Sequence, residues 1–498
     1  MDRNFGILLP LSCLPSKEGI GTMGKSAYSF IDYLKKAKAS VWQVLPLNPT
    51  SYGDSPYQSC SSNALNYYFI DLQTLIEEGL LKEEEAEFDN LFGGERHVNY
   101  GKQFNVKIAV LRKAFARFDG GKQFEDFVNS GEYADFAVFM ALKSKFNHRP
   151  WTEWEEPYRT YDKDIAERFA NENADEVRFW QFTQYIFLKQ WNKLKSYANL
   201  SGISIMGDIP LYIAYDSVEV WKYGDKLFRM SEKRVPTGVA GCPPDGFTEE
   251  GQLWGNPVYD WKKMKEGGYR WWLARIDGCF KLYDILRIDH FRGFDRYWEV
   301  PYGEQTAKGG HWEDGPKEEL FKDKLKSRIV AEDLGVIDGG VLRLMKNLGY
   351  PGMKVLEFAF DGRRDNEHKP SNHTENFVCY TGTHDNMPLK QYIEDLPEKE
   401  RKIFEDDLIK ECGLLSVGYD VKDASGICLS VIKLAFASKC ATVIIPMWDL
   451  LCMGGEARIN LPSTVSEKNW SWRFTEEDFS KDCLQFLKNT AENTHRAV

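Results

Sequence analysis

The chain has 498 residues, and 75 acidic against 64 basic side chains give a net charge of −11 at pH 7. Because nucleic acids and anionic membranes attract clustered Lys and Arg, this balance argues against both as main partners. Aromatic residues make up 14% of the chain. Such a content suits a saccharide binder, although many of these rings are expected simply to fill the core.

The 10 cysteines are scattered and form no CxxC pair. This pattern predicts reduced, mostly buried thiols, as in a cytoplasmic protein. The N-terminus lacks a cationic flank followed by a signal-length apolar segment, and no window is long and apolar enough for a membrane span. We therefore expect a soluble protein of the cytoplasm.

Eight short apolar runs along the chain predict buried strands. Helical spacing separates most of them, and the first helix of this kind is Ser26–Lys38. Alternation of strand and helix predicts an α/β fold, a (β/α)₈ TIM barrel spanning 1–498 as one catalytic unit. The eight runs are Phe5–Pro10, Val41–Pro46, Ile203–Pro210, Lys281–Ile288, Arg328–Ala331, Met353–Glu357, Phe377–Tyr380 and Ala441–Pro446.

Two long insertions are predicted at the C-terminal face of the barrel. Residues 50–200, between the second and third strands, are expected to be mostly helical. Residues 215–275, between the third and fourth strands, are expected to form a substrate-covering insertion. Its centre, Val239–Pro257, is rich in Gly and Pro and predicts a long loop.

Four predicted strands carry a carboxylate at or near their C-terminal end, namely Asp208, Asp289, Glu332 and Asp385. The C-terminal ends of barrel strands meet at the face where such enzymes place their sites. Arg287 lies two residues before Asp289, so both side chains share one face of an extended strand. A guanidinium beside a carboxylate favours its ionised form, although the pair could also be purely structural.

Converging carboxylates suit glycosidic chemistry. An ionised Asp289 would act as nucleophile, and Glu332, next to Asp333, would be a protonated acid that later acts as base. Asp385 could hold sugar hydroxyls, and His290 and His384 could donate hydrogen bonds to the same sugar.

Each of these residues also has a simpler explanation. Glu332 could cap a helix, Asp208 could be only a turn residue, and Trp254 could anchor its loop in the core. A metal at His384 and Asp385 is disfavoured, because the chain has only 8 His and no His-x-x-His pattern there.

One competing motif predicts nucleotide binding. Gly19–Ser26 fits the P-loop pattern and precedes a predicted helix. A P-loop springs directly from its strand, however, whereas Pro10 and several loop residues separate the first strand from Gly19. A plain Gly-rich turn is the favoured interpretation.

Several motifs, in order along nearly the whole chain, resemble those of the bacterial 4-α-glucanotransferases, also called amylomaltases or disproportionating enzymes, relatives of the α-amylase barrel group. The motifs are Gly53–Gln58, Gly207–Trp221, Val239–Trp261, Leu286–Phe294, Ala331–Gly335, Thr381–Asn386 and Gly455–Leu461.

The resemblance implies transfer of α-1,4-glucan segments between maltooligosaccharides, with glucose released and with no organic cofactor. It implies Asp289 as nucleophile, Glu332 as acid and base, and Asp385 as transition-state stabiliser. Further glucan contacts implied by the resemblance are Arg287, His290, His384, Asp208, Ser55, Tyr57, Gln252, Trp254 and Asn460. An α-amylase-type hydrolase and a non-catalytic glucan-binding protein stay open as alternatives.

The sequence departs from the family after Thr381–Asn386. The family commonly continues there with Asp and Thr, whereas this chain has Met387 and Pro388. The departure concerns contacts with the acceptor sugar, not the three carboxylates.

Overall fold

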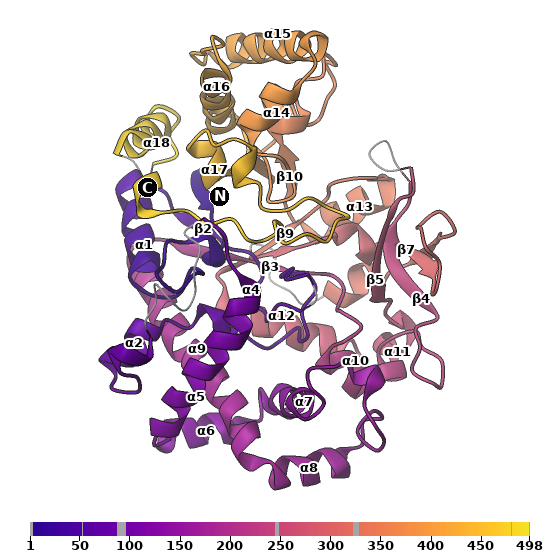
Figure 1. Ribbon diagram of the computed structural model, residues 1–498. Helices are drawn as coiled ribbons and strands as arrows, with labels where there is room; N and C mark the ends of the chain where they lie inside the picture. Colours follow the sequence, from indigo (N-terminus) through magenta and orange to yellow (C-terminus); the bar gives the residue numbers. More distant parts are fainter. Residues whose placement is uncertain are drawn as a thin grey trace.

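The computed structural model describes residues 3–51, 53–86, 96–244, 249–321, 328–479 and 481–497. Its main sheet has eight parallel strands (Figure 1). These are β1 (Asn4–Leu8), β2 (Val41–Gln43), β3 (Ser204–Ile209), β6 (Ile285–Ile288), β9 (Ile329–Ala331), β10 (Gly352–Val355), β11 (Phe377–Tyr380) and β12 (Thr442–Pro446).

The sheet closes on itself. Its strand order is β10-β11-β12-β1-β2-β3-β6-β9, so the two end strands are β9 and β10. These ends meet where the amide of Ala331 donates to the carbonyl of Pro351 at 2.8 Å and the amide of Met353 donates to Asp333 Oδ1 at 2.6 Å. The predicted (β/α)₈ barrel is therefore confirmed, with all eight strands on the predicted runs.

Helices connect the strands and follow the last one. They are α1 (Lys25–Ala37), α2 (Leu72–Glu77), α4 (Tyr100–Lys102), α5 (Ile108–Arg117), α6 (Lys122–Ser130), α7 (Ala134–Lys145), α8 (Lys163–Glu172), α9 (Ala174–Leu200), α10 (Val218–Tyr223), α11 (Trp261–Glu266), α12 (Arg270–Leu282), α13 (Gly339–Leu348), α14 (Leu389–Asp395), α15 (Glu398–Leu415), α16 (Ala424–Ala437), α17 (Met447–Leu450) and α18 (Lys481–Asn493).

Helix α1 shows why the alternating pattern folds in this way. Its buried face carries Phe30, Ile31 and Leu34, whose spacing puts them on one side of a helix. The helix ends at Ala37, and the left-handed conformation of its C-cap residue Lys38 (φ 68°) turns the chain back toward β2. The fourth strand starts later than predicted because α12 continues to Leu282.

The stretch between β2 and β3 is largely helical, and Figure 1 shows α5 to α8 gathered below the barrel. The long helix α9 fastens this stretch through buried glutamines. The amide of Gln184 bonds the backbone N–H and C=O of Leu65 at 2.8 and 3.0 Å. Gln190 does the same with Asp71 at 2.8 and 3.0 Å. Both glutamines satisfy loop backbone groups that water cannot reach.

A second sheet has four antiparallel strands, β4 (Gly238–Cys242), β5 (Gln252–Pro257), β7 (Arg296–Pro301) and β8 (His311–Asp314), in the order β5-β4-β7-β8. The prediction of a loop over Val239–Pro257 is therefore wrong for β4 and β5, while residues 245–248 of this motif lie outside the described residues.

The glycines of β4 misled that prediction. A Cβ on Gly238 would lie 2.1 Å from the Glu299 carboxylate, and one on Gly241 would lie 2.4 Å from the Gln252 carbonyl. These glycines allow strands to approach closely and do not mark turns.

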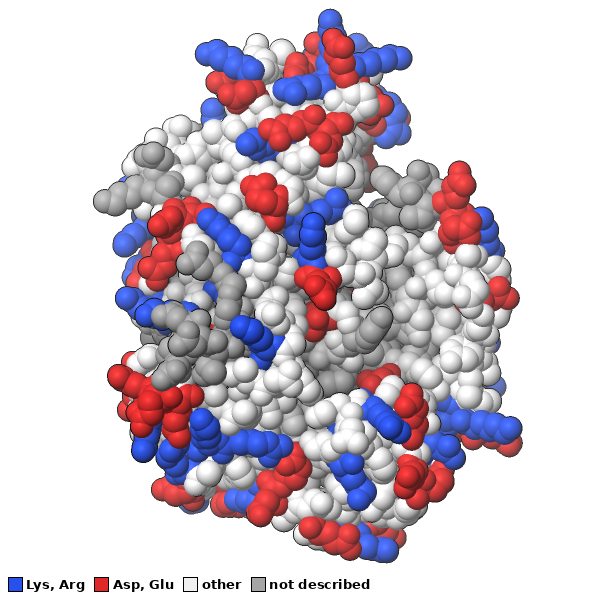
Figure 2. Space-filling model, viewed as in Figure 1, with Lys and Arg blue, Asp and Glu red and all other residues white. Residues whose placement is uncertain are grey.

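Acidic and basic side chains intermingle on the face shown in Figure 2. This mixture gives that face no broad basic area of the kind that binds polyanions. Within the described part of the chain, every helix is too short or too polar to cross a bilayer.

Candidate active site

A buried ion-pair row joins β3 to β6 at the mouth of the barrel. Asp208 and Arg287 are register partners. Arg287 Nη1 donates to Asp208 Oδ2 at 2.5 Å, and its Nη2 lies 3.1 Å from Asp289 Oδ1. The guanidinium thus bridges two carboxylates and fixes one oxygen of Asp289. Asp208 lies inside the strand, so it is not the turn residue considered from the sequence.

Glu332 follows β9 and is held by two backbone amides. Its Oε2 accepts from the amide of His290, and its Oε1 from the amide of Leu334, both at 2.7 Å. Since His290 follows Asp289 directly, the two carboxyl groups belong to the same end of neighbouring strands. Glu332 caps no helix, because α13 begins later with Asp338 as its N-cap.

The surroundings give the two carboxyls different protonation states. Burial raises the pKa of Glu332 to about 8, and the negative charge of Asp289 adds to this rise. Burial also raises the pKa of Asp289, but Arg287 opposes the rise and the value is about 6. At neutral pH Asp289 is therefore ionised while Glu332 keeps its proton.

Asp385 follows β11 and faces the opening. Its side chain is 47% exposed, and its Oδ2 lies 3.4 Å from His384 Nε2. Asn460 Nδ2 donates to its Oδ1 at 2.7 Å. His384 is buried, and burial lowers the pKa of its imidazole, which favours the neutral ring. Among the described residues, the side-chain groups with metal-binding spacing include neither His384 nor Asp385.

The motif Gly53–Gln58, which follows β2, reaches the same place. Tyr57 OH donates to Asp208 Oδ2 at 2.8 Å, and the Tyr57 amide donates to Ser55 Oγ at 3.2 Å. The next residue, Gln58, forms a reciprocal amide pair with Asn256 of β5, at 3.0 and 3.1 Å. This pair connects the loop to the second sheet across the site.

Strand β5 supplies the other predicted contacts. Trp254 Nε1 donates to Gln252 Oε1 at 3.1 Å. The Trp254 ring stands edge-on to His290, with centroids 4.8 Å apart and an 87° angle between the planes. Burial lowers the pKa of His290 to about 4, so this imidazole is neutral at pH 7. A half-buried indole beside a neutral imidazole can offer an apolar surface and a hydrogen bond to one sugar.

Asp208, which the resemblance implies as a glucan contact, is buried in this structure. Its side chain has no exposed surface. Both of its hydrogen bonds, to Tyr57 and Arg287, point to protein groups. Asp208 positions the residues that reach the opening.

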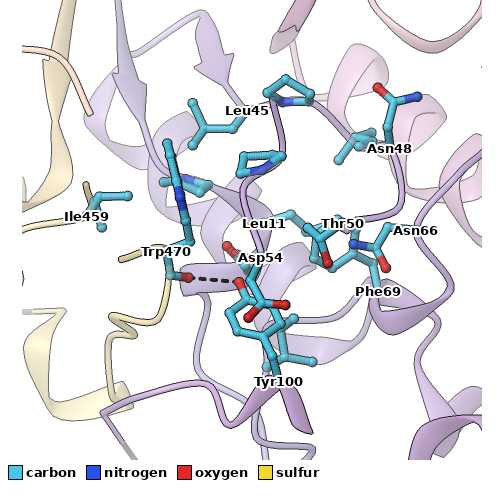
Figure 3. A pocket seen from close by; sticks show the side chains of 16 residues that line it. Leu11, Leu45, Asn48, Thr50, Asp54, Asn66, Phe69, Tyr100, Ile459 and Trp470 are labelled. Atoms are coloured by element: carbon cyan, nitrogen blue, oxygen red, sulfur yellow. Dashed lines mark hydrogen bonds between the residues drawn. The ribbon is translucent and has the colours of Figure 1, made fainter. Parts of the chain in front are cut away.

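Sequence reasoning missed Trp470. Its ring centroid lies 5.8 Å from those of Tyr57 and His384. Figure 3 shows Trp470 lining an adjoining pocket with Asp54 and Tyr100, where Tyr100 OH donates to the Trp470 carbonyl at 2.8 Å. No motif surrounds this tryptophan, so only the high aromatic content hinted at it.

Arg458 was also missed, although it stands inside the motif Gly455–Leu461. Its Nε donates to the Asn460 carbonyl at 2.9 Å, and its Nη2 lies 3.5 Å from the Asp385 carbonyl. The motif could have singled it out, because a guanidinium is suited to fixing two carbonyls at once.

The Gly19–Ser26 segment does not form a phosphate site. Residues 18–24 are buried. Thr22 donates to the carboxylate of Asp71 at 3.0 Å, and a Cβ on Gly24 would lie 2.0 Å from the same carboxylate. A negative charge packed against the N-terminus of α1 leaves neither room nor attraction for a phosphate.

A closed parallel barrel with two carboxyls of different pKa at its mouth has the arrangement that retaining glycoside-processing enzymes use. The profile of the 4-alpha-glucanotransferases, glycoside hydrolase family 77, matches residues 9–478. The chain belongs to this family.

Individual relatives agree over almost the full length. The 4-alpha-glucanotransferase of Clostridium butyricum is 44% identical over 480 residues, 95% of this chain and 96% of that protein. That of Aquifex aeolicus is 42% identical over 495 residues, 98% of both chains. Among solved structures, the amylomaltase of Streptococcus agalactiae in complex with acarbose has a TM-score of 0.93 and 37% identity, with 100% of both chains covered.

Proposed function

We propose that the chain transfers α-1,4-glucan segments between maltooligosaccharides, with Asp289, Glu332 and Asp385 as its catalytic carboxyls. Family membership makes it a glucanotransferase. The observation that carries the assignment of roles is the contrast at the barrel mouth. Asp289 is ionised beside Arg287, and Glu332 is protonated between two amides.

In the first half-reaction Glu332 gives its proton to the glycosidic oxygen as the bond from that oxygen to C1 breaks. Asp289 forms the new bond to C1 and produces a glycosyl ester. Its Oδ1 contacts Arg287, so we assign the attack to Oδ2. The released sugar departs with a new 4-hydroxyl, and Glu332 is left as a carboxylate.

In the second half-reaction the 4-hydroxyl of an acceptor glucan loses its proton to Glu332. Its oxygen attacks C1, and the ester bond to Asp289 breaks. Two inversions retain the α configuration, and both side chains return to their starting states.

Asp385 would hold hydroxyls of the reacting sugar and bind it more tightly as the ring flattens. Asn460 occupies its Oδ1, which leaves Oδ2 toward the opening. We assign contacts with the glucan chain to the polar and aromatic side chains around the three carboxyls. These are Arg287, His290, His384, Ser55, Tyr57, Gln252, Trp254 and Asn460.

Transfer in place of hydrolysis requires that water be kept from the glycosyl ester. The Tyr57 loop and β5 are joined by the Gln58–Asn256 amide pair. We infer that these two segments cover the glycosyl ester on Asp289 and bind the acceptor glucan. In this view residues 50–200 and 215–275 are insertions of one catalytic barrel.

We place this enzyme in the cytoplasm. Cys13, Cys60, Cys379, Cys412, Cys428 and Cys440 are buried and outside any disulfide, and reduced cysteines persist in a reducing compartment.

The decisive experiment is incubation of the purified protein with maltotriose and chromatography of the products. Transfer predicts glucose together with a ladder of longer maltooligosaccharides. Steady formation of glucose and maltose without longer products would instead identify a hydrolase, and unchanged maltotriose would identify a binding protein.

A further inference from the structure

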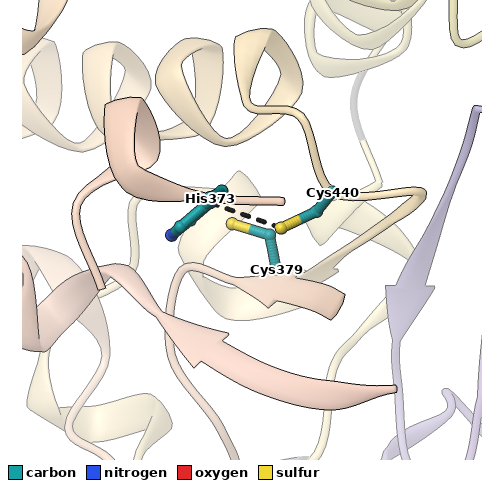
Figure 4. A group of neighbouring side chains, drawn as sticks. All are labelled: His373, Cys379 and Cys440. Carbon is teal, nitrogen blue, oxygen red and sulfur yellow. Dashed lines mark hydrogen bonds between the residues drawn. The ribbon is translucent and has the colours of Figure 1, made fainter. Parts of the chain in front are cut away.

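A second group of reactive side chains lies outside the cleft. His373, Cys379 and Cys440 are all buried, and their Nδ1 or Nε2 and Sγ atoms lie within 4.8 Å of one another (Figure 4). Cys379 belongs to β11, Cys440 precedes β12, and His373 precedes β11. The proposed mechanism uses none of the three.

The hydrogen bonds of His373 determine which ring nitrogen is free. Its Nε2 lies 3.0 Å from the carbonyl of His368, and a carbonyl only accepts, so Nε2 carries the hydrogen. Nδ1 therefore has a lone pair, and it lies 3.3 Å from Cys440 Sγ. An imidazole that donates one N–H to a backbone carbonyl and offers its other nitrogen is typical of a metal ligand.

A buried cation borders the group. Arg496 is fully buried, and its Nη2 donates to the carbonyls of Ser438 and Cys440 at 2.8 and 2.7 Å. These two hydrogen bonds fix the backbone that carries Cys440, so its thiol is held in place beside His373.

One further polar side chain lies next to the group. The Ser438 hydroxyl is fully buried, and it lies within hydrogen-bonding reach of both thiols. A hydroxyl at this position is placed to bind a fourth ligand or to complete the shell itself.

We propose that His373, Cys379 and Cys440 bind a structural zinc ion. Ligand bonds of about 2.3 Å to sulfur and 2.0 Å to nitrogen put a sulfur and a nitrogen roughly 3.5 Å apart around a tetrahedral ion. The 3.3 Å between Cys440 Sγ and His373 Nδ1 matches that span. Binding releases one proton from each thiol, so two thiolates balance the charge of Zn²⁺ while the imidazole stays neutral.

The position of the site predicts its role. Two ligands precede β11 and β12, at the end of the barrel opposite the carboxylates. Residues at that end of such barrels contribute to stability. The ion would connect two neighbouring strands, so its loss should lower the melting temperature without changing turnover by the folded enzyme.

The test uses the full-length protein produced with zinc in the medium and then dialysed against metal-free buffer. Mass spectrometry of the metal content should find about one equivalent of zinc. Exchange with Co²⁺ should give intense visible d–d bands and a thiolate-to-cobalt charge-transfer band. Cys440→Ser should lose both signals. Cys428→Ser should keep both, because it changes one of another pair of neighbouring thiols, Cys428 and Cys452.

Wild-type protein with only traces of zinc and no thiolate–cobalt band would overturn the proposal, and the three groups would then form only a neutral hydrogen-bonded chain. Both wild-type readouts decide the matter even if Cys440→Ser does not fold. Loss of zinc from Cys428→Ser with retention by Cys440→Ser would also count against this site. A normal product ladder from zinc-free protein would leave the proposed function intact.

Discussion

Arg287 divides its two carboxylate partners into different roles. It reaches Asp208 on one side and Asp289 on the other, but only Asp289 has exposed side-chain surface, at 27%. The buried partner orients the guanidinium, and the exposed partner is left to react. Arg287 can thus keep the nucleophile Asp289 ionised while Asp208 holds the guanidinium in place.

The nucleophile can be tested directly. Asp289→Asn keeps the shape of the side chain but removes the attacking oxygen, so turnover of maltotriose should fall by at least about 10³-fold. Circular dichroism and melting temperature should show a retained fold. Asp314→Asn, which changes an exposed carboxylate paired with Lys317, is the matched control. Unchanged turnover in Asp289→Asn would remove it from the mechanism.

The pH dependence follows from the two carboxyl pKa values. Below pH 6 Asp289 gains a proton and stops being a nucleophile, and above pH 8 Glu332 loses the proton that it must donate. A plot of kcat/KM against pH should therefore be bell-shaped, with limbs near about 6 and 8. A profile that stays flat from pH 5 to 9 would contradict this assignment.

Asp208→Asn gives a finer test. The negative charge of Asp208 raises the pKa of Asp289, so removing this charge should move the acidic limb of the profile to lower pH. The alkaline limb, set by Glu332, should move less. A merely structural role for Asp208 predicts lower activity with both limbs in place, so the positions of the limbs distinguish the two roles.

At the scale of elements, the segment Gly53–Gln58, which carries Tyr57, is joined to β5 by the amide pair of Gln58 and Asn256. Each of its two hydrogen bonds contributes about 1 kcal/mol. Asn256→Ala should loosen the cover and raise the ratio of hydrolysis to transfer several-fold, measured as reducing ends formed against longer oligomers from maltotriose.

Gln305→Ala is a suitable control for that experiment. Gln305 is exposed, and its side chain donates to the nearby Gly303 carbonyl at 3.3 Å. The control should leave the ratio unchanged. An unchanged ratio in Asn256→Ala as well would show that this pair does not exclude water.

The barrel strands could be predicted because each is a short apolar run with helical spacing after it, and that information is local. The β4–β5 hairpin could not, because its glycines resemble loop residues until Glu299 and the Gln252 carbonyl are seen packed against them. Likewise, the pairing of β4 with β7 joins segments far apart along the chain.

Across the whole molecule, barrel topology made the carboxylates predictable. Once eight parallel strands are recognised, the residues at their C-terminal ends must meet, whatever their distance in sequence. Asn460 was named as a candidate contact because it lies in the motif Gly455–Leu461. Trp470 lies in no motif, and its contacts with Tyr57 and His384 are seen only in the folded structure. The burial that separates the pKa values of Asp289 and Glu332 also depends on the complete fold.

Few hydrogen bonds among the described residues join β9 to β10, where the barrel closes. Two of the three proposed catalytic carboxyls, Asp289 and Glu332, lie on one side of this joint, and Asp385 lies on the other. Glu332 remains attached to β6 through the Ile288 carbonyl and the His290 amide. Asp385 lies beyond the joint, in the segment that follows β11. The nucleophile and the proton donor therefore share one side of the joint and are tied to each other by direct hydrogen bonds, whereas the carboxylate proposed to hold the sugar stands on the other side.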